Sequence, residues 1–68
     1  MVTDTVRQLG GVIQTAAVAR VVPETVYRAM KIGHFTNAAA VVRIVRAVAP
    51  GDAAAQMALA ARLAGLSE

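Results

Sequence analysis

Helix-breaking residues divide this alanine- and valine-rich chain into five segments of helical pattern. The 68-residue chain is 57% apolar, and most of the excess is alanine, which has the highest helix propensity, together with valine. Glycine is conformationally free and proline lacks an N–H donor, so both end or begin helices. They stand at Gly10-Gly11, Pro23, Gly33 and Pro50-Gly51. The sequence therefore predicts an all-α fold of five helices in one domain, residues 1–68.

The first two segments are short. A lead-in helix over residues 3–9 is expected to have Thr3 or Asp4 as its N-cap, because short polar side chains accept hydrogen bonds from the free N–H groups of a first turn. A second helix is expected over residues 12–20, and its small alanines allow another helix to approach closely. The apolar positions at helical spacing in this second segment are Ile13, Ala16 and Ala17.

The third segment, residues 23–31, has two different faces. Pro23 suits a first helical turn, where its missing N–H has no intrahelical partner, and Gly33 closes the helix. The apolar stripe expected to face the core is Val22, Val26, Ala29 and Met30. The other face carries Glu24, Tyr27, Arg28 and Lys31. Such a face can contact both phosphates and base edges of DNA, and the alternative is a solvated face on a small helical bundle.

The fourth segment follows the connection His34-Phe35-Thr36. Asn37 is a good N-cap for a helix running to about Ala49, and Phe35 is expected to fill the core between helices. Arg43 and Arg46 stand together at i, i+3, either as a solubilising surface pair or as a phosphate clamp. The apolar stripe is Val41, Val42, Val45 and Val48, with Ile44 beside it.

The last segment is apolar on nearly every side. Asp52 is expected to cap a helix over residues 53–66. A terminal helix in so small a domain cannot bury its whole circumference, so its large side chains are expected to divide between the core and a second subunit. These side chains are Met57, Leu59, Leu63 and Leu66. Residues 52–66 are therefore predicted to be a dimerisation helix, and the alternative is a helix that leaves alanines in water.

Composition excludes several function classes. There is no cysteine for a disulfide or thiolate site, His34 is the single histidine, and the four acids are scattered at Asp4, Glu24, Asp52 and Glu68. No metal site, cofactor or catalytic constellation is expected, so the protein is predicted not to be an enzyme. The net charge of +3 favours an anionic partner. Without a signal peptide or a membrane-spanning run, a cytoplasmic, nucleoid-associated location is expected.

Residues Ala16 to Gly33 resemble the helix-turn-helix of Cro and phage-repressor-like (XRE-type) regulators and of related addiction-module antitoxins. The resemblance rests on a small residue at Ala16, apolar residues at Val21 and Val26, and the stretch Thr25-Val26-Tyr27-Arg28. It covers about residues 9–49, with the helix-turn-helix at about residues 12–32. Arg20 stands where the family usually turns on glycine, and Val22 replaces the usual polar cap.

The resemblance implies a small homodimeric transcriptional repressor that binds double-stranded DNA, with an inverted repeat as the expected site. The third helix would enter the major groove, Arg28 would contact guanine, and Gln14 and Thr15 would bind a phosphate. The full set of candidate DNA contacts is Gln14, Thr15, Pro23, Glu24, Thr25, Tyr27, Arg28, Lys31, His34 and Arg43.

Two alternatives remain open at this stage. In the first, an antitoxin-type interaction module binds a toxin or another protein through its apolar last helix. In the second, the chain is an excisionase-like architectural DNA-binding protein, since residues 22–35 are also similar to the Thr-Val-Tyr-Arg stretch of excisionase and MerR-type winged helices. A winged helix needs a β-hairpin after the recognition helix, whereas residues 37–48 have helical spacing.

Overall fold

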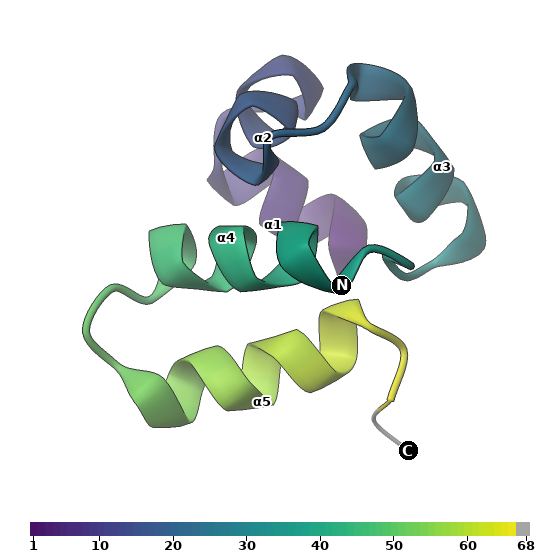
Figure 1. The fold of residues 1–68 in the computed structure, drawn as a ribbon. Coiled ribbons are helices and arrows are strands. Elements are labelled where there is room, and N and C mark those ends of the chain that lie inside the picture. Colours follow the sequence, from purple (N-terminus) through teal and green to yellow (C-terminus); the bar gives the residue numbers. More distant parts are fainter. Residues whose placement is uncertain (67–68) are drawn as a thin grey trace.

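The computed structural model describes residues 1–66, and Ser67 and Glu68 lie outside this range. The described chain is entirely helical, as predicted, and contains no strand (Figure 1). Its five helices are α1 (Val2–Gln8), α2 (Val12–Ala19), α3 (Pro23–Ile32), α4 (Ala38–Val48) and α5 (Ala53–Leu63).

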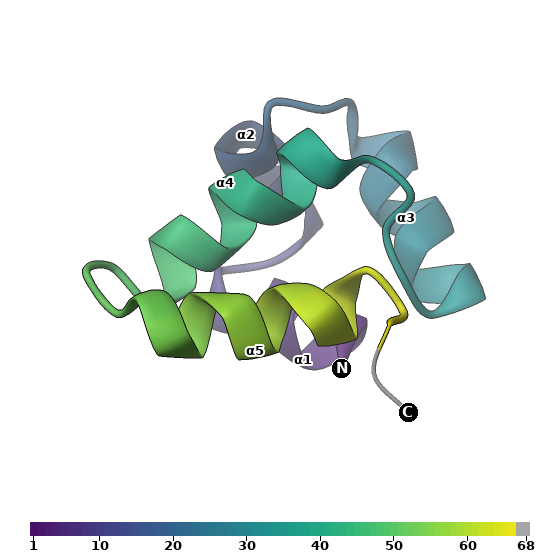
Figure 2. The same cartoon turned by 60° about the horizontal axis from the view of Figure 1, so that its bottom comes forward.

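Helix α4 lies at the centre of the arrangement. It packs against α2 on one side and runs antiparallel to α5 on the other, while α3 packs on α2 and α1 contacts both α2 and α3 (Figures 1 and 2). Helix α3 therefore lies at one edge of the domain, held mainly through α2. One long face of α3 remains uncovered as a consequence.

Most helix ends are set by local chemistry, as predicted. Gly33 ends α3 with a φ of 96°, a left-handed conformation that costs glycine little. The Asn37 side chain accepts hydrogen bonds from Ala39 N at 3.0 Å and Ala40 N at 3.3 Å at the start of α4. The Asp52 side chain accepts from Ala55 N at 3.0 Å and caps α5.

Two predicted helix boundaries are wrong. Helix α1 begins at Val2 with no side-chain cap, so Thr3 and Asp4 lie inside the helix. In its first turn the Thr5 N–H donates a backbone hydrogen bond to Met1 O. Helix α5 ends at Leu63 rather than Leu66, because Gly65 takes a positive φ of 75° that turns the chain out of the helix.

The core is built from all five helices and Phe35. The loop residue Phe35 is buried, as predicted, and its N–H donates to Leu63 O at 2.7 Å, which ties the α3–α4 loop to the end of α5. The buried apolar residues are Val2, Val6, Ala16, Ala19, Val26, Ala29, Phe35, Ala40, Val41, Ile44, Val45 and Leu63.

Helix α2 presents a different face to the core than predicted. Ile13 is 68% exposed and Ala17 is also exposed, whereas Thr15 is fully buried beside Ala16. Thr15 tolerates burial because its hydroxyl donates to Gly11 O at 2.8 Å, so no polar group is left unpaired. The predicted apolar face of α2 is therefore correct only at Ala16.

The apolar stripes of α3 and α4 are also shifted from their predicted positions. Val26 and Ala29 are buried as expected, but Val22 precedes the helix and is exposed. In α4, Ile44 was expected to lie beside the stripe but is fully buried. Val42 was expected within the stripe but is exposed. An α-helix turns 100° per residue, so a stripe centred on Ile44 carries Val42 away from the core.

Ile44 and Ile13 form a matched pair for testing the core. Ile44→Val should lower the free energy of unfolding by about 0.5–1.5 kcal/mol, because it removes a buried methylene and leaves a small cavity. Ile13→Val removes the same group from an exposed site and should change stability by less than about 0.5 kcal/mol. Urea denaturation followed by circular dichroism measures both, and equal losses would contradict the orientation of α2 and α4 described here.

Candidate nucleic-acid interface

The turn between α2 and α3 is made by Arg20, Val21 and Val22. Arg20 has φ 58° and ψ 45°, the left-handed conformation, and is the sole non-glycine residue with positive φ among residues 1–66. Val21 N donates to Ala16 O at 3.0 Å and closes the turn. An arginine here adopts the backbone of the glycine that this type of turn usually carries, at a cost of roughly 1 kcal/mol.

The uncovered face of α3 carries the four polar residues expected there. Glu24, Tyr27, Arg28 and Lys31 are all exposed, while Val26 and Ala29 on the opposite side are buried. Arg28 Nη2 lies 3.4 Å from Glu24 Oε2, one helical turn away. Both side chains of this ion pair are mostly in solvent, so the pair contributes little to stability and opens easily.

The candidate contacts at the start of α2 and α3 differ in exposure. Gln14, in the first turn of α2, is exposed, and so is Pro23. Thr25 is half-buried. Thr15 does not fit the predicted phosphate contact, because it is fully buried and its hydroxyl already donates to Gly11 O.

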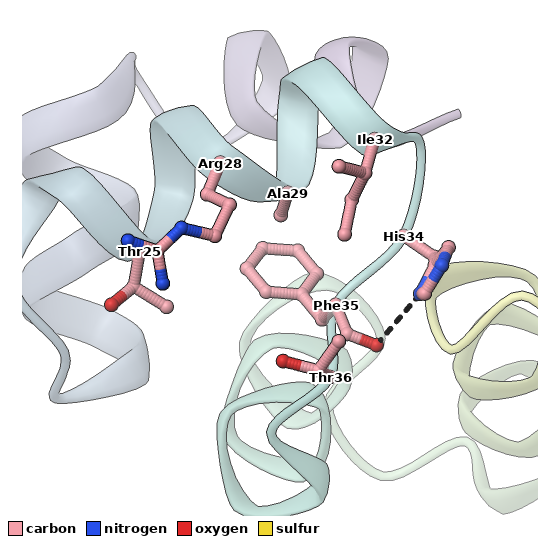
Figure 3. Close-up of a pocket in the computed structure, with 7 residues that line it drawn as sticks. All are labelled: Thr25, Arg28, Ala29, Ile32, His34, Phe35 and Thr36. Carbon is pink, nitrogen blue, oxygen red and sulfur yellow. Dashed lines mark hydrogen bonds between the residues drawn. The ribbon is translucent and has the colours of Figure 1, made fainter.

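A small hollow lies between α3 and the α3–α4 loop (Figure 3). Arg28 and Thr25 lie on one side of the Phe35 ring, and Thr36 lies on the other. The hollow has a volume of about 30 Å³. It admits one water molecule and is far smaller than the roughly 300 Å³ of a cofactor pocket. The hollow is lined by Thr25, Arg28, Ala29, Ile32, His34, Phe35 and Thr36.

His34 lies at the side of this hollow opposite Arg28 (Figure 3). Its ring points away from Arg28 toward the last turn of α5 (Figure 3), and a Cβ at Gly65 would lie 3.1 Å from His34 Cγ. His34 Nδ1 lies 3.2 Å from Phe35 O, a geometry in which the ring N–H donates to the carbonyl. The structure therefore places His34 at the edge of the hollow that Thr25 and Arg28 also line, with its ring beside Gly65 rather than on the exposed face of α3.

Arg43 has a structural contact that sequence reasoning missed. Its Nη1 donates to Ala19 O at 3.0 Å, so a half-buried guanidinium binds the carbonyl at the end of α2. A cation at a helix C-terminus also complements the negative end of the helix dipole. Arg43 is thus neither a surface pair with Arg46 nor a free phosphate clamp, and it holds α2 on α4.

Arg20 is an exposed cation next to α3 that sequence analysis left out of the candidate set. It lies in the turn that leads into α3, three residues before Pro23. The available signal was its position at the junction between the second and third predicted helices, where the resembled family usually turns on glycine.

The side chains predicted for the dimer interface separate into two groups. Leu63 is fully buried in the core, and the partly buried Leu59 packs against the core. Both leucines therefore stabilise the fold of the single chain. Met57 and Leu66 are 74% and 78% exposed. The predicted interface set is wrong at Leu63, because its side chain is fully buried in the core of the single chain.

Comparisons with family models, curated proteins and solved structures give no match to this chain. Within residues 1–66, no three metal-binding side chains gather as a ligand set. None of the described helices has the length and apolar character needed to cross a bilayer.

The Arg43–Ala19 bond predicts a difference between two arginines on one helix. Arg43→Ala should lower the free energy of unfolding by about 1–2 kcal/mol, because a charged hydrogen bond to a half-buried carbonyl is lost. Arg46→Ala removes an exposed cation three residues later and should change it by less than about 0.5 kcal/mol. Urea titrations of both variants measure the difference, and equal values would show that the Ala19 contact contributes nothing.

The left-handed Arg20 predicts that glycine is favoured at this position. Arg20→Gly should be about 1 kcal/mol more stable than Arg20→Ala, because only the alanine variant keeps a Cβ in the unfavourable conformation. Both variants remove the same charge, so the comparison isolates backbone strain. Thermal unfolding at fixed protein concentration measures it, and an alanine variant as stable as the glycine variant would refute the strained turn.

Proposed function

We propose that this chain binds double-stranded DNA through the exposed face of α3 and acts as a small homodimeric transcriptional repressor. The observation that supports this most directly is the one-sided burial of α3. Val26 and Ala29 are buried, whereas Glu24, Tyr27 and Arg28 on the other face are in solvent. An α-helix fits the major groove of B-DNA when one of its faces is free of its own domain. Helix α3 at the edge of the fold meets this requirement (Figure 1).

Arg28 is the residue proposed to contact a base. Its position in the middle of α3 places the guanidinium on the uncovered face, where it forms an exposed ion pair with Glu24 at 3.4 Å. Exchanging this exposed ion pair for a bidentate bond to guanine O6 and N7 costs little and gains a specific contact. The ion pair therefore leaves Arg28 free to bind a base.

Glu24 is proposed to contribute discrimination rather than affinity. A carboxylate on a DNA-binding face repels phosphates, but it accepts a hydrogen bond from cytosine N4. Its location one turn before Arg28 on the same face lets the two side chains contact neighbouring base pairs. Glu24→Gln should therefore bind all duplexes more tightly and distinguish among them less well.

Three exposed residues around α3 are proposed to contact phosphates. Lys31 lies at the last turn of α3, Arg20 lies in the turn before it, and Gln14 lies in the first turn of α2. With a net charge of +3, such contacts give affinity that falls as salt rises. Repression would follow from occupancy of a promoter, and a two-fold dimer would select an inverted repeat.

Arg28→Ala and Lys31→Ala distinguish a base contact from a phosphate contact. Arg28→Ala should cost about 1–3 kcal/mol on the preferred duplex and relax the preference at one base pair. Lys31→Ala should weaken binding to all duplexes alike and reduce the magnitude of the salt slope by about one. The preferred duplex comes from selection in a random oligonucleotide pool, followed by titration at three salt concentrations.

Arg62→Ala is the control for net charge, since Arg62 is an exposed cation on α5. It should leave affinity for the selected duplex within about twofold. If Arg28→Ala lowers affinity equally for selected and scrambled duplexes, Arg28 contacts phosphate only. A pool that yields no enriched sequence would overturn the proposed function.

A further inference from the structure

An open apolar groove of about 370 Å³ runs between α4 and α5. Its more buried surface is formed by Val41 of α4 and by half-buried alanines in and directly after α5, and its exposed rim is formed by larger apolar side chains. The alanines are Ala60, Ala61 and Ala64, and the rim residues are Val42, Met57 and Leu66. The residues that line the groove include no charged or polar side chain.

We infer that this groove is the surface on which a second copy of the chain docks, with Met57 of each copy inserted among the alanines of the other. The same patch carries both a projecting side chain and a hollow that accepts one, as a two-fold interface requires. Met57 is 74% exposed, and its flexible thioether adapts to an irregular hollow. The inference rests on the homodimer of the proposed function and identifies the surface through which its two copies meet.

A dimer would bury the groove together with the adjoining surfaces of α4 and α5. A specific interface between two proteins buries roughly 800 Å² on each partner. This is about a fifth of the 4248 Å² accessible surface of the chain, and the groove extends along two of its five helices. A 68-residue domain without a cysteine also gains more from self-association than a larger domain would.

Charge also favours the groove over the other exposed surfaces as a contact between copies. Each copy has a net charge of +3, so two copies repel unless they meet at an uncharged face. The groove contains no residue of α3, so Arg28 and Lys31 of both copies stay available to DNA. Salt screens the repulsion between copies, so the dimer should strengthen with rising salt while DNA binding weakens.

The test is sedimentation equilibrium of the full chain without DNA, at low and high salt and over a concentration range reaching several hundred micromolar. The unaltered chain should show the mass of two copies, and Met57→Glu should raise the dissociation constant by at least about tenfold. Ile13→Glu is the matched control, because it places the same charge at another exposed apolar site on α2. It should change the dissociation constant by less than about threefold.

A second measurement keeps the outcome independent of charge effects. The chain contains no cysteine, so Ile13→Cys and Ala61→Cys each introduce one thiol, and a bifunctional thiol crosslinker of short span should join only Ala61→Cys copies. Circular dichroism confirms that each variant is folded.

Each contrary outcome has a definite meaning. A single-copy mass at all concentrations would overturn the inference, and so would a dimer that is equally sensitive to Met57→Glu and Ile13→Glu. A monomer whose groove binds a different protein would assign the surface to that protein instead. Since these measurements contain no DNA, they fail or succeed separately from the selection for a DNA site.

Discussion

The buried face of α4 is the constraint on which the arrangement of the other helices depends. It meets α2 and α5 at the same time, with the fully buried Ile44 between them. The Arg43 guanidinium adds a polar link from α4 to the last carbonyl of α2 at 3.0 Å. Helix α3 is held largely through α2, so the orientation of its exposed face follows from how α2 is seated on α4.

Helix number and most helix ends could be predicted because they depend on neighbours in sequence. Gly33, Asn37 and Asp52 act through their own backbone or through N–H groups two or three residues away. The rotation of α2 could not be predicted in the same way. Its residues are nearly all small or apolar, so the pattern lacks the contrast that separates a buried face from an exposed one. Burial of Thr15 depended on its own bond to Gly11 O.

The candidate site shows the same division between local and distant causes. The polar face of α3 was predictable because charged and apolar residues alternate with helical period over ten residues. The roles of Arg43 and His34 were not, because each depends on a segment far along the chain. Ala19 lies 24 residues before Arg43, and His34 packs beside Gly65. Leu63 was assigned to a dimer interface for the same reason, since it is buried in a core that distant parts of the chain form.

The unequal anchoring of α5 has a consequence for local unfolding. Leu63, in the last turn, is the one buried side chain within Ala53–Leu63, whereas the first turn is held by the Asp52 cap and the bond from Gln56 Nε2 to Ala49 O at 2.9 Å. The first two turns can therefore open to solvent while the core remains intact. Amide hydrogens there should exchange through local openings at a fraction of the global free energy, while the Phe35 amide, bonded to Leu63 O, exchanges only with the core.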